Sequence, residues 1–227
     1  LHLLSRRQRQ MCKETGTYTG PIYKSDINYV NDDKSKELKV SVTYAIDIRN
    51  ENVNTDRTVK VNQIVDYFDA KYEKTGIKVG TAIDETTGEV TGELSVSNVE
   101  NVNSKYNKIT IDTTKLGEIA GTGENHKTIY VKFDLSKAQI AEILNGEQSN
   151  APLDNVAEIT SYSTLQNGKP YAAIDKDSIP NNSKIGEENT YEDDTDRAPS
   201  FVLHPEDDRT LSGTVFIDRL LYTSDAA

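Results

Sequence analysis

Apolar and polar residues alternate along several stretches of this chain, most clearly over residues 39–50. The apolar members of that stretch share one parity: Val40, Val42, Tyr44, Ile46 and Ile48. Successive side chains of a β-strand point to opposite faces, so the pattern predicts a strand with one buried and one solvated face. Shorter runs predict further strands over residues 58–68, 77–83, 94–99, 108–112, 129–135, 155–165, 170–174, 201–203 and 211–218.

One helix is expected in the connection after the strand at 129–135. Ser136 is suited to cap its N-terminus, Gln139 completes a capping box, and Gly146 is suited to end the helix. The apolar side chains between them fall on one helical face: Ile140, Ile143 and Leu144. Further along, Asn167-Gly168 predicts a tight hairpin turn. Many short strands with one short helix in a connection favour an all-β fold, an immunoglobulin-like β-sandwich.

The composition agrees with a β-rich chain and limits its partners. The 227 residues include 12 Tyr and no Trp, and the formal net charge is -11. Nucleic acid and anionic membrane surfaces both require a cluster of Lys and Arg, which the body of the sequence lacks. No apolar run reaches the ~18 residues that would span a membrane. Cys12 is the single cysteine, so no internal disulfide is possible.

Both ends of the chain resemble translated sequencing-adapter DNA, of the kind found at the ends of gene fragments. The resemblance covers residues 6–12, with the sequence RRQRQMC, and residues 220–227, with the sequence LLYTSDAA. We therefore expect residues 1–13 and 220–227 to be non-native, and we leave them out of the fold prediction. The alternative is that the first segment is a genuine basic arm.

The body carries several motifs in a characteristic order. Residues 42–50 (VTYAIDIRN) are similar to a Y-x-I-x-V-x-N strand, residues 65–69 (VDYFD) to a V-x-D strand end, and residues 155–159 (NVAEI) to a closing N-x-A-x-V strand. Residues 175–182 and 192–194 resemble an acidic tail of the form D-x-D-S-x-P-x-N…E-D-D. Together these segments resemble the conserved-repeat, isopeptide-type β-sandwich domains of Gram-positive bacterial surface proteins.

A last segment, residues 211–218 (LSGTVFID), resembles the opening strand of a Cna-B-type (Sdr B-type) repeat. The resemblance implies a sandwich domain over residues 14–172, an acidic joint over 173–205 and the truncated first strand of a Cna-B-type domain over 206–219. It also implies a structural spacer in the stalk of a secreted, cell-wall-anchored adhesin, whose partners are neighbouring modules of the same chain. The alternative is an adhesin head that recognises a host protein or glycan.

The same resemblance implies an internal isopeptide bond, because related domains join a Lys near the first strand to an Asn on the last with the help of a carboxyl group. By position in the motifs, the three residues are Lys24, Asn155 and Asp66. The reaction needs a neutral amine and a protonated acid, and burial favours both. Asn155 shares strand parity with Ala157, and Asp66 with Phe68. The alternative is a hydrogen-bonded core Asn, a turn Asp and a surface Lys.

The acidic joint is a candidate calcium site. Calcium ions take about six to eight oxygen ligands on a flexible loop. The segment offers carboxylate and amide side chains at Asp175, Asp177, Asn181, Glu192, Asp193, Asp194 and Asp196. Their spacing is not that of an EF-hand, and the alternative is a solvated linker between modules. Calcium is the one cofactor that the sequence suggests.

Catalytic motifs are missing from the sequence. It contains no G-x-S-x-G, no H-E-x-x-H and no P-loop. His126 lies in a stretch rich in Gly and Asn, and His204 precedes Pro205, so we expect exposed loop residues rather than a catalytic pair. The sequence therefore predicts a protein that is not an enzyme.

Overall fold

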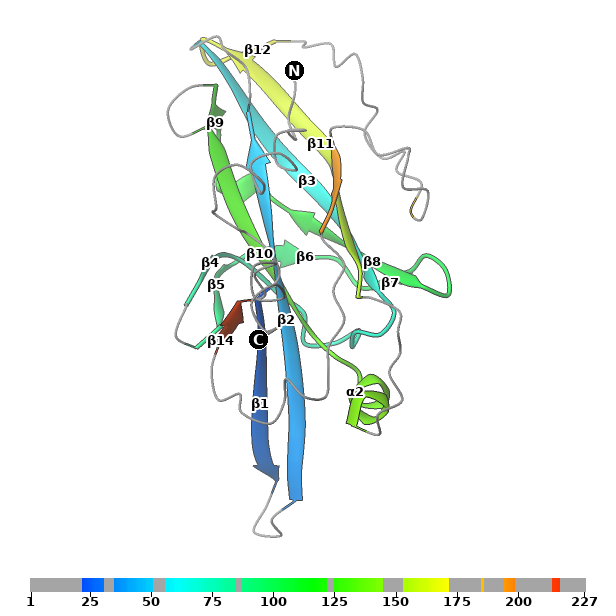
Figure 1. Ribbon diagram of the computed structural model, residues 1–227. Coiled ribbons are helices and arrows are strands. Elements are labelled where there is room, and N and C mark those ends of the chain that lie inside the picture. Colours follow the sequence, from blue (N-terminus) through cyan, green and yellow to red (C-terminus); the bar gives the residue numbers. More distant parts are fainter. Residues whose placement is uncertain are drawn as a thin grey trace, which may run out of the picture.

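A computed structural model describes residues 22–30, 35–50, 56–84, 87–121, 125–144, 153–171, 185, 194–198 and 214–216. For residues 22–40, 141–144 and 214–216 only the backbone is described. The strands form two antiparallel sheets with a shared apolar core, so the prediction of an all-β sandwich is confirmed (Figure 1). Within the described part of the chain, no helix has the length and apolar character needed to cross a membrane.

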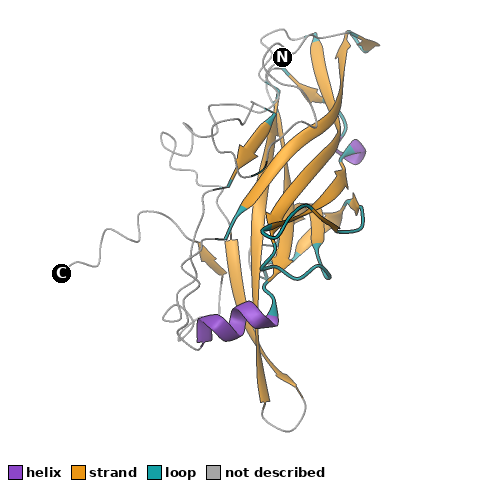
Figure 2. Cartoon of the chain, turned by 90° about the vertical axis from the view of Figure 1, so that its right-hand side faces the viewer, coloured by secondary structure: helices purple, strands orange, loops and turns teal. Residues whose placement is uncertain are grey.

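The first sheet, sheet A, has six strands in the order β14-β1-β2-β10-β4-β5. Their bounds are β14 (Thr214–Phe216), β1 (Ile22–Val30), β2 (Ser35–Arg49), β10 (His126–Asp134), β4 (Lys78–Ile83) and β5 (Val90–Glu93). Residues 35–43 of β2 pair with β1, and residues 41–49 pair with β10. Below residue 41, β1 and β2 therefore continue as a two-stranded ribbon, which extends past the rest of the sheet (Figure 2).

The second sheet, sheet B, has the path β12-β11-β3-β8-β6, with three short strands beside it. The path strands are β12 (Lys169–Pro170), β11 (Asn155–Gln166), β3 (Arg57–Asp69), β8 (Tyr106–Asp112) and β6 (Ser95–Val96). The others are β13 (Thr195–Arg197) beside β11, β7 (Glu100–Asn101) beside β8, and β9 (Ile119–Ala120) beside β3. A 3-10 turn, η1 (Thr114–Leu116), follows β8. β3 and β11 form the centre of this sheet, and they carry the candidate site.

The core lies between the two sheets and is made by the alternating apolar residues that predicted the strands. Val42, Tyr44, Ile46 and Ile48 of β2 are buried, and they face buried residues of β3, β8 and β11. Burying one such side chain contributes roughly 1.5–3 kcal/mol, so these rows account for much of the stability. Aromatic rings gather at one end of the core, where the rings of Phe68 in β3 and Phe133 in β10 have centroids 4.6 Å apart.

The predicted strand over residues 94–99 is shorter in the structure, where only Ser95 and Val96 form a strand, β6. β5 ends at Glu93 in sheet A, and β6 begins at Ser95 in sheet B. Leu94 is buried in the core between them, and its N–H donates to the carbonyl of Val79. The chain thus crosses from sheet A to sheet B at Leu94, and the expectation of a strand as far as residue 99 was wrong because strand pairing ends after Val96.

The predicted helix is present as α2 (Lys137–Leu144). The Ser136 hydroxyl accepts a hydrogen bond from the N–H of Gln139, as a helix cap does. In a capping box, the Gln139 side chain would accept a hydrogen bond from the N–H of Ser136. Here that N–H donates to the carbonyl of Lys71. The hairpin turn is also confirmed, because Asn167 and Gly168 have φ angles of 51° and 71°, which a type I′ turn requires.

Two short strands lie in segments that the sequence assigned outside the sandwich. Residues 195–197, expected in an acidic joint, form β13, the orange strand in Figure 1. They pair with residues 156–158 of β11. Residues 214–216, expected to begin a further domain, form β14 and pair with residues 22–24 of β1. The predicted strand at 201–203 lies outside the described residues. His126, expected in a loop, is the exposed first residue of β10.

Candidate functional site

Asp66 and Asn155 meet in the interior of the sandwich. Asp66 lies in β3 and Asn155 begins the adjacent strand β11, and the register pairs Asp66 with Ala157 and Asn155 with Phe68. Both side chains face the core, with 0% and 3% of their surface exposed. The Asn155 Nδ2 donates to the Asp66 Oδ1 at 2.7 Å. The structure thus brings together two of the three residues named for a cross-link.

The carboxyl group of Asp66 is poorly compensated. Burial raises its pKa to about 7, although the hydrogen bond from Asn155 acts in the opposite direction. Its Oδ2 is buried and has no hydrogen-bond partner among the described residues. An unpaired buried carboxylate oxygen is costly, and protonation lowers that cost. Near neutral pH, Asp66 therefore holds a proton for a substantial part of the time, which is the state that an acid catalyst of amide chemistry requires.

Lys24, the third residue, is placed by the backbone register of β1. It pairs with Ser41 of β2, while its neighbour Tyr23 pairs with Val42. Val42 belongs to the core row, and Ser41 hydrogen-bonds Asp134, the residue that pairs with it in β10. Cross-strand partners share a face, so the register position of Lys24 lies on the side of sheet A away from the core. The Lys24 side chain lies outside the described part of the structure, so its role in the cross-link stays a prediction.

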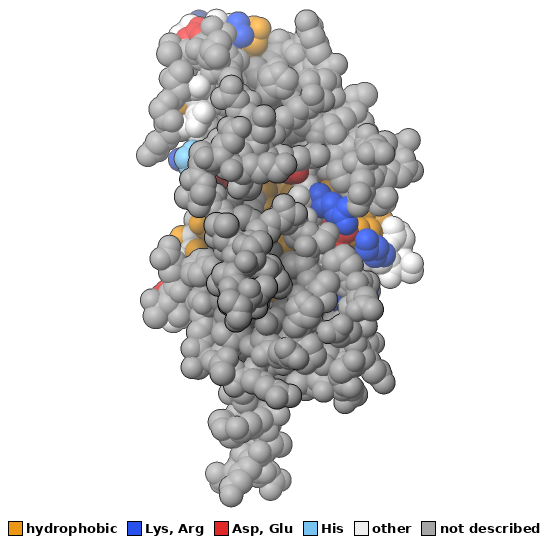
Figure 3. Space-filling view, in the orientation of Figure 1, with side chains coloured by type: hydrophobic (Ala, Val, Ile, Leu, Met, Phe, Trp, Pro, Cys, Tyr) orange, Lys and Arg blue, Asp and Glu red, His pale blue; other side chains and the backbone are white. Residues whose placement is uncertain are grey.

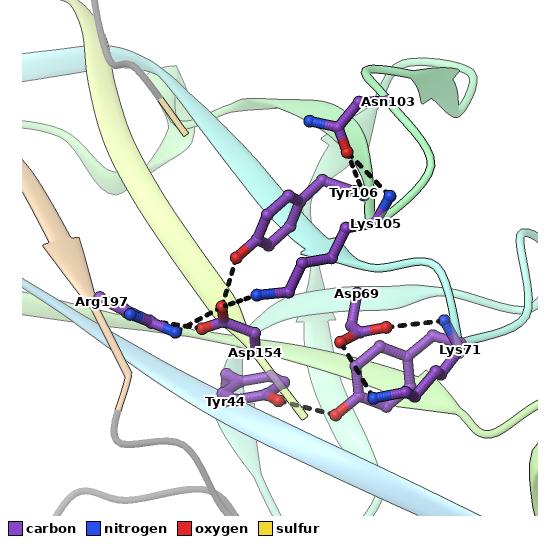
Figure 4. A network of polar contacts seen from close by, with 9 residues as sticks. Tyr44, Asp69, Lys71, Asn103, Lys105, Tyr106, Asp154 and Arg197 are labelled. Carbon is purple, nitrogen blue, oxygen red and sulfur yellow. Dashed lines mark hydrogen bonds and ion pairs between the residues drawn. The ribbon is translucent and has the colours of Figure 1, made fainter. Parts of the chain in front are cut away.

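A network of charged and polar side chains surrounds Asp154, the residue before Asn155 (Figure 4). Arg197 of β13 binds the Asp154 carboxylate with two hydrogen bonds, Nε to Oδ1 at 2.6 Å and Nη2 to Oδ2 at 2.7 Å. The Tyr106 hydroxyl and the Lys105 ammonium also donate to Oδ2. Burial alone would raise the pKa of Asp154, but these donors hold it below its ordinary value. Asp154 is thus a fully paired buried anion.

A second part of the network lies beside it. Asp69 at the end of β3 accepts from the N–H of Lys71 and forms an ion pair with the Lys71 ammonium at 3.6 Å. Burial raises the pKa of Asp69, and Lys71 counteracts this. The hydroxyls of Tyr44 and Tyr72 hydrogen-bond each other at 2.7 Å in the core. The sequence named none of these residues as functional: Tyr44 and Tyr72 lie 28 positions apart, and the Asp69–Lys71 pair, although close in sequence, forms no motif.

The outer face of sheet B carries a smaller apolar cluster. Val65, Tyr67 and Val156 are buried there, and Ile185 packs against them. Glu158, on the same face, has no exposed surface, and its carboxylate accepts a hydrogen bond from the Tyr67 hydroxyl at 3.0 Å. The chain after β12 therefore returns to this face, and part of the predicted joint is packed onto the sandwich.

The calcium candidates are only partly described. Asp175, Asp177, Asn181, Glu192 and Asp193 lie outside the described residues. Asp194 is buried, and its carboxylate accepts from the Thr195 hydroxyl; the Asp196 carboxylate accepts from the N–H of Arg197. In the described part of the chain, no three His, Cys, Asp or Glu side chains gather in a way that could hold a metal ion. The calcium site remains a prediction.

The described surface exposes few large hydrophobic side chains. Its exposed large hydrophobic residues are Val96 and Val102, and none of its described Tyr side chains is fully exposed. The face in Figure 3 shows hydrophobic side chains in small separate groups beside Lys and Arg. The alternative of an adhesin head stays a prediction.

Comparisons with known proteins give no assignment. No family model matches the chain, and no curated protein matches it. One solved structure, described as the unique CBM of Ruminiclostridium thermocellum, is 14% identical, with a TM-score of 0.23 over 69% of this chain and 99% of that chain. So low a likeness says nothing about what this chain binds.

Proposed function

We propose that this chain is a structural spacer module in the stalk of a cell-wall-anchored bacterial surface protein, and that it has no catalytic activity towards other molecules. The motifs at 42–50, 65–69 and 155–159 are the basis for this surface-protein assignment. A sandwich whose described surface exposes few large hydrophobic side chains suits a part that holds its neighbours apart. Such a module lies outside the cell, and its partners are the adjacent modules of its own chain.

The observation that carries this proposal is the buried contact between Asp66 and Asn155, 2.7 Å apart on adjacent strands. In an isopeptide reaction, a neutral Lys Nζ attacks the Asn155 Cγ, the C–N bond of the side-chain amide breaks, and ammonia leaves with the protons that the acid relays. Asp66 is suited to be that acid, because burial raises its pKa to about 7. A bond of this kind would strengthen an extracellular module that has no disulfide.

Two rearrangements are needed before the reaction can occur. The Asn155 amide now points its nitrogen at Asp66, so a half-turn about the Cβ–Cγ bond must bring its oxygen to the protonated acid. The amine must also reach the core side of sheet A. A shift of β1 by one residue against β2 exchanges the two faces of the strand, and it would move Lys24 to the row of Val42. Phe133, the β10 partner of Val42, packs on Phe68 beside Asn155.

The intact mass of the purified full chain tests the cross-link. We expect the protein to be lighter than its sequence by one ammonia, and peptide mapping should join Asn155 to Lys24. The Asp66→Ala variant keeps both reacting residues and should regain the full mass, because it lacks the acid. Asn107→Ala is a matched control, since Asn107 is buried in sheet B and pairs with Phe68 from the other side. A wild-type mass equal to that of the sequence would exclude the bond.

A further inference from the structure

The outer face of sheet B, which looks away from the core, is apolar at its centre. Val65 and Tyr67 of β3 lie on this face, opposite to the core residue Phe68. In β11, Val156 pairs with Tyr67 and Glu158 pairs with Val65, and cross-strand partners share a face. An antiparallel sheet with one solvated side usually carries polar residues there. The residues of this face are therefore those of a surface that is covered.

The burial of this face agrees with its composition. Val156 and Glu158 each have 0% of their surface exposed, although neither points into the space between the two sheets. A sheet face that is shielded from water in this way has a further layer of chain packed on it. Ile185 packs against the apolar residues of the face. Ile185 thus shows which part of the chain supplies the layer.

The segment between β12 and β13 leaves the sandwich at β11 and returns to it at β11. At its start, the N–H of Tyr171 donates to the carbonyl of Thr164 at 2.9 Å. At its end, the carbonyl of Asp194 accepts from the N–H of Ile159 at 2.9 Å. These two points of β11 lie about 17 Å apart along the strand. Residues 172–193 could extend over ~70 Å, so the segment is long enough to cross the outer face and come back.

We infer that the outer face of sheet B is a docking surface for the chain's own residues 172–193, with Ile185 seated on Val65, Tyr67 and Val156. Docking removes the apolar surface of both partners from water, which favours it. The acidic segment is then a third layer of this domain rather than a solvated linker, and a joint with a neighbouring module begins after β13. The inference rests on the contacts of sheet B and stands whether or not the module is a spacer.

Disulfide trapping on the full chain tests the docking. Cys12→Ser removes the native thiol, and Ile185→Cys is then combined in turn with Val65→Cys, with Val156→Cys or with Ser95→Cys. Ser95 is an exposed residue of β6 in the same sheet, so the third pair is the matched control. Under mild oxidation, we expect an intramolecular disulfide from 185 to 65 or to 156 at least about tenfold faster than to 95, because two cysteines bond only when their Cα atoms lie within about 7 Å.

The control pair gives the outcome expected without docking. A segment that moved freely would bond first to the exposed thiol at 95, since the positions at 65 and 156 are buried; that order would overturn the inference. A disulfide-linked dimer would overturn it as well, because the segment of a second copy would then occupy the face. So would the lack of a disulfide at both 65 and 156. None of these outcomes involves the loss of ammonia from the wild-type chain, which tests the proposed function separately.

Discussion

At the scale of single residues, Asp66 is a side chain whose burial in the core destabilises the fold. A carboxyl group with no exposed surface and one unpaired oxygen stands where an apolar side chain would pack without cost. The chain keeps Asp66 beside Asn155, so the pair either has a chemical role or fixes the register of β3 against β11. The pH dependence of stability shows how much this residue costs.

We expect Asp66 to make the folded protein less stable as the pH rises. Below about pH 4, both the folded and unfolded states hold its proton; between there and the folded-state pKa of about 7, only the folded state does. The stabilising contribution of the neutral acid is therefore lost as the pH rises towards 7. At about 1.4 kcal/mol per pKa unit, the loss is at most about 4 kcal/mol. Urea titrations from pH 4 to 8 measure the resulting change in the free energy of unfolding.

A comparison of variants assigns the pH dependence of the unfolding free energy to Asp66. Asp66→Asn keeps the shape and cannot ionise, so its stability should vary less between pH 5 and 8 and should exceed that of the wild type at pH 8. Asp112→Asn is the control, because hydrogen bonds from Thr114 lower the pKa of that exposed carboxyl, and its titration lies at lower pH. If Asp66→Asn retained the full wild-type slope, Asp66 would be ionised in the folded state.

At the scale of elements, the sequence predicted the long strands well and the edge strands poorly. Four long strands begin and end within about four residues of their predicted bounds: β2, β3, β10 and β11. A long run of alternating apolar and polar residues shows which face of the strand is buried. β13 has three residues and pairs with a strand about forty positions earlier. So short a run carries no period, and nothing local indicates its partner.

The β4–β5 hairpin is an element where a glycine is required by close packing. The register pairs Gly80 of β4 with Glu93 of β5. A methyl group at Gly80 would collide with the carbonyl oxygen of Thr91 and lie 2.9 Å from its carbonyl carbon. We expect Gly80→Ala to destabilise the protein by about 1–3 kcal/mol, as overpacking does. Thr81→Ala, at the exposed next position, should change stability by less than about 0.5 kcal/mol. Thermal unfolding of the two variants measures the contrast, and equal midpoints would show that the hairpin can move apart.

At the scale of the whole molecule, the candidate site shows what a sequence can and cannot contribute. Asp66 and Asn155 could be named together because each lies in a motif strand and each shares parity with apolar neighbours. The pairing of Asp154 with Arg197 could not, since 43 residues separate them and nothing local connects them. The sequence did contain one signal: Arg197 is a lone basic residue at the end of a run of carboxylates. Its ion pair with Asp154 explains why a basic residue stands there.

The acidic segment leads to the last prediction, which concerns the joint as a whole. Asp196 lies in β13 and Asp194 directly precedes it, while the other candidate ligands come earlier in the sequence. If a calcium ion bridges the two groups, it binds the folded chain alone and must stabilise it by about 2.7 kcal/mol at a hundred times its dissociation constant. The melting midpoint should then rise with calcium and fall with a chelator, and Asp196→Asn should reduce the difference. Magnesium is the control ion, because it prefers a smaller octahedral shell. A midpoint that is the same with calcium and with chelator would mean that these carboxylates hold no calcium ion in the folded chain.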